Sequence, residues 1–124
     1  GYYTQRIPPD EDAAVSLQTY GYAICHVDVA TDRLDSYEIL RGDLGEAEYT
    51  FTSVLQEYSY ETLTSVLGFA EAEREIHQAL DALVMATAGH EEETLVAVAL
   101  HITRYEHWNM PGYFRSAAYP EGTP

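Results

Sequence analysis

The chain of 124 residues carries 21 acidic residues against six arginines and no lysine, which gives a formal net charge of −15. Schiff-base chemistry and a P-loop both need a lysine amine, so both are excluded. A charge of this sign also disfavours direct contact with nucleic acids or membranes, because phosphates and anionic lipids are bound through basic patches.

Residues 10–108 are predicted to form a single α+β domain. The chain is 46% hydrophobic and contains eleven tyrosines, which is enough for a packed core despite the charge. Residues 1–9 end in Pro8-Pro9 and are predicted to be an N-terminal arm, since consecutive prolines cannot continue a hydrogen-bonded element. Residues 109–124 are interrupted by proline and glycine and are predicted to be a C-terminal tail.

The sequence predicts a cytoplasmic location. It contains neither an apolar stretch long enough for a membrane span nor a basic segment followed by an apolar leader. Cys25 is the single cysteine of the sequence, which excludes an internal disulfide and agrees with a reducing compartment.

Residues 14–29 alternate between apolar and polar side chains, which predicts a half-buried strand with a bend or bulge at Gly21. Residues 30–33 have turn chemistry, and residues 34–40 resume a strand-like run. We therefore expect these two strand segments to form a β-hairpin.

Residues 46–58 fit both a helical stripe and a strand, and the pattern does not decide between them. Residues 60–88 carry apolar side chains at spacings of three and four, which predicts a helix that ends at Gly89 and that Gly68 splits or kinks. Residues 91–108 fit a strand or a helix, and the strand is favoured because it can pair with the hairpin.

Together these segments predict an α+β fold in which an antiparallel sheet with an N-terminal β-hairpin packs against one long or two shorter helices. A mostly α chain is the alternative, and it requires both residues 46–58 and residues 91–108 to be helical.

A candidate metal site lies in the predicted helix. Glu73, His77 and Asp81 follow one another at four-residue spacing, which aligns them along one helical edge where neighbouring pairs can chelate an ion. The same spacing commonly does no more than stabilise a helix, and we favour that explanation. Cys25 is expected to be a buried structural cysteine, and the sequence indicates no catalytic residue and no cofactor.

The tyrosines suggest a contact surface, because tyrosine and tryptophan concentrate at protein interfaces. The residues predicted to take part in interactions are Tyr20, Tyr22, Tyr105, Trp108 and Tyr113. Their partner is expected to be another protein or a second copy of the chain in a homodimer.

The leading functional hypothesis is a non-enzymatic acidic interaction protein, of the inhibitor, immunity or anti-defence type, that binds a basic site on a partner protein. One alternative is a metal- or small-ligand-binding module, or a small enzyme, with a cleft lined by His26, His77 or His101. Another is halophilic adaptation, in which the charge serves solubility in high salt and is unrelated to any partner.

Overall fold

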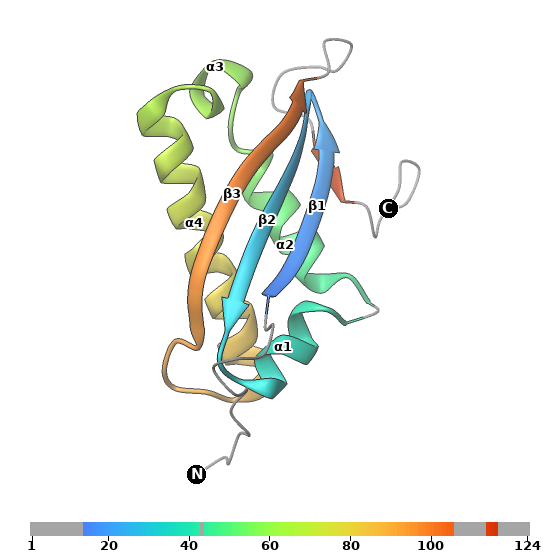
Figure 1. The fold of residues 1–124 in the computed structure, drawn as a ribbon, viewed down its shortest axis with the longest axis vertical. Coiled ribbons are helices and arrows are strands. Elements are labelled where there is room, and N and C mark those ends of the chain that lie inside the picture. The colour runs from blue at the N-terminus through green and yellow to red at the C-terminus, as the bar shows by residue number, and fades with distance from the viewer. Residues whose placement is uncertain (1–13, 43, 106–113, 117–124) are drawn as a thin grey trace.

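The computed structural model describes residues 14–42, 44–105 and 114–116. They form a two-layer α+β fold, in which helices pack on one face of a four-stranded antiparallel sheet with the strand order β3-β2-β1-β4 (Figure 1). The strands are β1 (Ala14–Gly21), β2 (Ala23–Thr31), β3 (Leu95–Tyr105) and β4 (Phe114–Ser116), and the helices are α1 (Leu34–Leu40), α2 (Glu46–Leu55), α3 (Tyr60–Leu63) and α4 (Val66–Ala88). The α+β class predicted from the sequence is confirmed.

The N-terminal hairpin is present, but its strands are β1 and β2, and the chain reverses at Gly21 and Tyr22. Val15 pairs with Val29, so odd-numbered residues of β1 face odd-numbered residues of β2. The apolar side chains therefore keep the same alternation through the turn. The pattern over residues 14–29 belongs to two strands, and the prediction of one bent strand was wrong.

Residues 34–40, predicted as the second strand of the hairpin, form helix α1 instead. Strand β2 is already paired with β1 on one side and β3 on the other, which leaves no sheet edge for a further partner. Leu34, Tyr37 and Leu40 lie three residues apart, a spacing that suits a helix with one apolar face as well as it suits a short strand. Asp35 lies in the first turn, where the helix dipole favours a carboxylate.

The other helical segments follow the predicted spacings, with a different break point. Residues 46–58, which the sequence left open, contain α2, and residues 60–88 form α3 and α4. The break falls before Ser65, whose Oγ accepts a hydrogen bond from the Gly68 N–H at 3.1 Å and caps α4. Gly68 is required inside the first turn, because a Cβ there would lie 1.9 Å from the carbonyl oxygen of Thr62. Helix α4 ends as predicted at Gly89, whose φ of 75° is left-handed.

The hydrophobic core lies between the sheet and helices α2 and α4, which Figure 1 shows behind the strands. The central apolar side chains of this core are Leu17, Val27, Val29, Phe51, Leu55, Ile76, Leu80, Val84 and Phe114. The opposite face of the sheet is not covered by any helix of the described residues (Figure 1). In that part of the chain, no helix combines the length and the apolar character that crossing a bilayer requires.

The third strand was predicted correctly, and the sheet continues beyond it. β3 lies within residues 91–108 and pairs with β2, so the mostly α alternative does not apply. β4 lies within the predicted tail and pairs with β1, and its residue Phe114 is 1% exposed in the core. The fold thus includes part of residues 109–124, whereas the predicted arm at residues 1–9 lies outside the described residues.

Candidate metal centre

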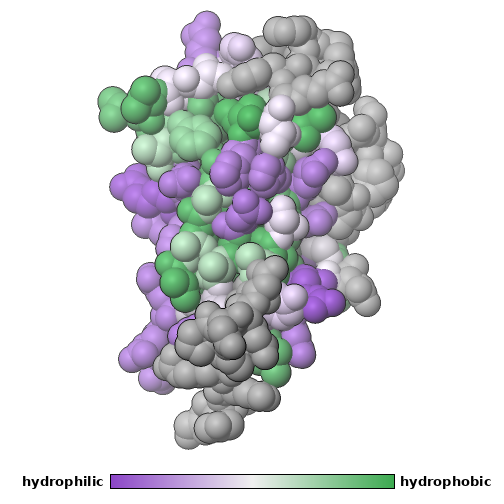
Figure 2. All heavy atoms as spheres, in the orientation of Figure 1, coloured by the Kyte–Doolittle hydropathy of each residue, from purple (hydrophilic) through white to green (hydrophobic). Residues whose placement is uncertain are grey.

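Two histidines and an aspartate meet on the open face of the sheet. In β2 the residues Cys25, Val27 and Val29 point into the core, so the alternating residues His26 and Asp28 lie on the opposite face. The register between β2 and β3 pairs His26 with His101. Figure 2 shows a hydrophilic patch in the middle of this face, bordered by hydrophobic side chains.

Asp28 lies beside both imidazoles. Its Oδ2 atom is 3.2 Å from Nε2 of His101 and 3.7 Å from Nε2 of His26. The two rings stack, with centroids 4.6 Å apart and planes inclined by 16°. The side chain of His26 is 27% exposed, and those of Asp28 and His101 are 47% exposed, so solvent reaches all three.

This arrangement fits the ligand set of a divalent transition metal. His26, Asp28 and His101 each offer one ligand atom, and these atoms lie within 4.8 Å of one another, which no other trio of His, Cys, Asp or Glu achieves among the described residues. A bond length of about 2.0–2.2 Å to the metal would place neighbouring ligand atoms about 3 Å apart. Stacked rings direct their lone pairs side by side, so binding requires the imidazoles to rotate, which their exposure allows.

The stripe predicted on α4 lies elsewhere, against the edge strand β3. Glu73 accepts a hydrogen bond from the Leu100 N–H at 3.0 Å through Oε2. Oδ1 of Asp81 accepts hydrogen bonds from the N–H groups of Thr94 and Leu95 at 3.3 and 3.2 Å. The two carboxylates therefore bind the backbone of β3, an arrangement that covers an otherwise open sheet edge with a helix.

His77 contacts one end of this stripe. Its Nε2 atom lies 3.1 Å from Oδ2 of Asp81, and neither atom has a hydrogen-bond partner elsewhere in the described residues. The structure brings His77 and Asp81 together, while Glu73 is occupied by β3. Metal binding by these three residues stays a prediction, and their contacts favour the structural explanation.

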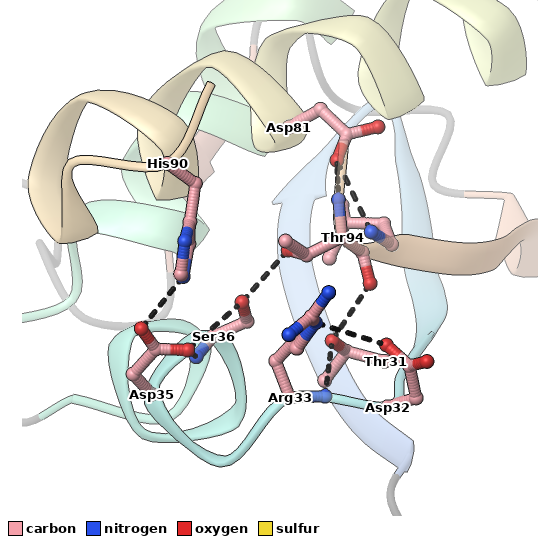
Figure 3. Close-up of polar contacts among 9 residues, drawn as sticks. Thr31, Asp32, Arg33, Asp35, Ser36, Asp81, His90 and Thr94 are labelled. Carbon is pink, nitrogen blue, oxygen red and sulfur yellow. Dashed lines mark hydrogen bonds and ion pairs between the residues drawn. The ribbon is translucent and has the colours of Figure 1, made fainter. Parts of the chain in front are cut away.

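The contact made by Asp81 belongs to a larger polar network at the start of β3 (Figure 3). Oγ1 of Thr94 lies 2.7 Å from Oγ of Ser36, and the Thr94 carbonyl accepts a hydrogen bond from Oγ1 of Thr31 at 2.9 Å. Nε2 of His90 lies 2.6 Å from Oδ2 of Asp35. The Ser36 hydroxyl thus joins α1 to the residue that precedes β3, and at 0% exposure it is not accessible to a substrate.

The predicted interaction residues are distributed differently from the expectation. Tyr22, predicted to take part in an interaction, is 3% exposed because it lies at the turn, where its ring packs edge-on against Phe114. Tyr20 is partly exposed, and its hydroxyl accepts a hydrogen bond from Nε2 of Gln18 at 2.9 Å. Tyr105 lies at the end of β3, where it pairs with Ala23. The remaining two, Trp108 and Tyr113, lie outside the described residues.

Cys25 is buried, as its alternation pattern predicts. Burial raises the pKa of its thiol to about 12. Cys25 is 0% exposed, and a thiol with so high a pKa supplies almost no thiolate at neutral pH, which argues against a role as a nucleophile.

The sequence analysis named His26 and His101 as residues of a His-lined cleft. It did not name Asp28, the third member of the cluster. The available signal was the spacing of His26 and Asp28, because residues two apart in a strand share a face. Comparison of the chain with protein families, with curated proteins and with solved structures found no match. The argument about function therefore depends on the geometry alone.

Proposed function

We propose that the protein is a metal-binding module that holds a divalent transition-metal ion with His26, Asp28 and His101. The observation that carries this proposal is the convergence of the three ligand atoms from two strands within 4.8 Å. Two imidazoles and one carboxylate suit ions such as Zn²⁺, Co²⁺, Ni²⁺ and Fe²⁺, whereas Mg²⁺ and Ca²⁺ prefer oxygen ligands alone.

The centre is suited to an ion that exchanges or reacts, because three protein ligands leave coordination positions open to water or to a further ligand. Asp28 and His101 are each 47% exposed, which supports coordination positions that face solvent. The net charge of −15 also supports the proposal, since a negative field raises the local concentration of cations. The negative field attracts any cation, and the two imidazoles add a preference for transition-metal ions.

Titration of the metal-free full chain with Zn²⁺ or Co²⁺ in a calorimeter tests the proposal. We expect one ion per chain, and Co²⁺ should give visible absorption bands characteristic of nitrogen and oxygen ligands. At a free concentration a hundred times Kd, binding stabilises the fold by about 2.7 kcal/mol, which raises Tm by about 10 °C for a domain of this size.

Single substitutions locate the site. His26→Ala and His101→Ala should each weaken binding by about a hundredfold or more, since even the loss of an outer-shell partner costs about ten- to a hundredfold. His77→Gln is the matched control, because His77 contacts Asp81 on the other side of β3 and should leave the affinity unchanged. A result in which His77→Gln abolishes binding while His26→Ala does not would assign the ion to the α4 stripe and refute the proposed centre.

A second candidate function is the leading hypothesis from the sequence composition. In it, the chain is an acidic protein that binds a basic site on a partner protein. It is supported by exposed acidic side chains such as Glu91, Glu92 and Glu93 and by the exposed apolar residues Val66 and Leu67 on the first turn of α4. Its test is an association rate that falls steeply with ionic strength. A homodimer, a cytoplasmic location and halophilic adaptation stay predictions from the sequence.

A further inference from the structure

A shallow groove of about 520 Å³ separates the beginning of α4 from the end of β3. Leu63, Val66 and Phe69 form its apolar wall, and the strand side is lined by Leu100, His101 and Ile102. Val66 is 86% exposed at the rim of the groove. We call this feature the β3 groove.

The strand side of the β3 groove is a backbone edge. β3 is the outermost strand on its side of the described sheet. The Leu100 N–H points away from β2, because it donates to Glu73 of α4. In an antiparallel strand every second residue directs its N–H and C=O to the same side, so the backbone groups of Ile102 also point outward.

Helix α4 binds the earlier part of this edge at three backbone N–H groups. Asp81 binds the N–H groups of Thr94 and Leu95, and Glu73 binds that of Leu100. Beyond Leu100 the helix gives way to the groove, which lies along Ile102. An extended segment can pair with the strand there while its side chains contact the apolar wall, as in recognition by strand addition.

Charge decides what kind of segment fits. Glu73 binds the N–H of Leu100, which lines the groove, and Glu61 and Glu71 are exposed in the two helices that form its wall. A second copy of the chain would bring a further charge of −15 to this edge, which disfavours pairing between two β3 strands. The occupant that complements both the acidic surroundings and the apolar wall is a basic segment with alternating apolar side chains.

We propose that the β3 groove binds an extended basic segment of a partner protein, which adds to the edge of β3 and places an apolar side chain against Val66 and Phe69. This proposal rests on the second candidate function and gives it a location. His101, a ligand of the proposed metal centre, also lines the groove, so the test uses the metal-free chain.

A fluorescein-labelled peptide in which lysine alternates with valine is a suitable probe, and its binding to the full chain is measured by fluorescence anisotropy. We expect saturable binding with one peptide per chain that weakens as salt is raised. A peptide with N-methylated amides at every second residue cannot pair with a strand edge and should bind at least about tenfold more weakly. The matched peptide with glutamate in place of lysine should not bind.

Val66→Ser removes the apolar rim and should weaken binding by about tenfold, the factor that corresponds to losing contact with one valine side chain. Val96→Ser is the control. Val96 is also a solvent-exposed valine, but it lies at the beginning of β3 and does not line the groove. If the lysine peptide binds but neither Val66→Ser nor N-methylation changes its affinity, the groove is not the site, although the acidic-partner function stands. If the glutamate peptide binds as tightly, or no lysine peptide binds even at low salt, both are refuted.

Discussion

Replacing Asp81 with alanine is expected to destabilise the fold by about 3 kcal/mol. Asp81 is 3% exposed, and its Oδ1 is the acceptor for the N–H groups of Thr94 and Leu95. Alanine would leave both buried donors without a partner, and each unsatisfied donor costs about 1–3 kcal/mol. Because the two distances, 3.3 and 3.2 Å, are at the long end for hydrogen bonds, we take the lower half of that range for each.

Urea unfolding followed by far-ultraviolet circular dichroism measures this loss, and hydrogen exchange shows where it occurs. The amides of Thr94 and Leu95 should lose protection in Asp81→Ala, because they are the donors to the missing carboxylate. Asp81→Asn keeps one acceptor oxygen and should cost only about 1 kcal/mol. Glu92→Ala, an exposed change in the neighbouring turn, is the control and should stay within about 0.5 kcal/mol of wild type. An Asp81→Ala variant as stable as that control would refute the role assigned to the α4 carboxylates.

Gly68→Ala should destabilise the fold by about 2–4 kcal/mol in thermal unfolding, because its Cβ would lie 1.9 Å from the backbone oxygen of Thr62; wild-type stability would show that the α3–α4 link can shift. The Cys25 thiol, whose pKa burial raises to about 12, should resist Ellman's reagent at pH 8 until denaturant is added, and rapid labelling of the native chain would contradict its burial. Burial, and then the hydrogen bond that its hydroxyl donates to Glu75, raise the pKa of Tyr58 above its ordinary value. The folded state therefore keeps a proton that the unfolded state releases above about pH 10, and stability should fall there more steeply in wild type than in Tyr58→Phe.

The sheet was predictable from the sequence because strand alternation is a local property, whereas the turn positions were not. Val15 pairs with Val29, and a hairpin whose partners share parity has the same apolar pattern as one long strand. Helix α1 was missed because apolar residues three apart over a short segment fit both a helix and a strand. The strand is ruled out by the sheet topology, since β3 already occupies the second edge of β2. Phe114 reaches the core from the predicted tail through pairing with Gly21, a contact that no local pattern indicates.

The candidate site was predictable only in part, for the same reason. The spacing of His26 and Asp28 places them on one face of a strand, but the third ligand, His101, comes from a strand 75 positions later in the chain. Its position depends on the register of β2 against β3, which shifts at a bulge between Ile24 and Cys25. The four-residue spacing on α4 did identify residues that act together, but spacing alone does not show that their common partner is the backbone of an edge strand.

The structure divides the acidic residues into two groups that salt should affect differently. Glu73 and Asp81 bind backbone N–H groups, and because these contacts are wholly or partly buried they are screened little by salt. Glu91, Glu92 and Glu93 are exposed, so their mutual repulsion is the kind that molar salt removes. If the chain is adapted to high salt, replacing the exposed glutamates with glutamine should restore folding at low salt, measured by circular dichroism across a KCl series. Folding that is already complete at low salt would instead leave the exposed charge available to explain the attraction of a metal ion or of a basic partner.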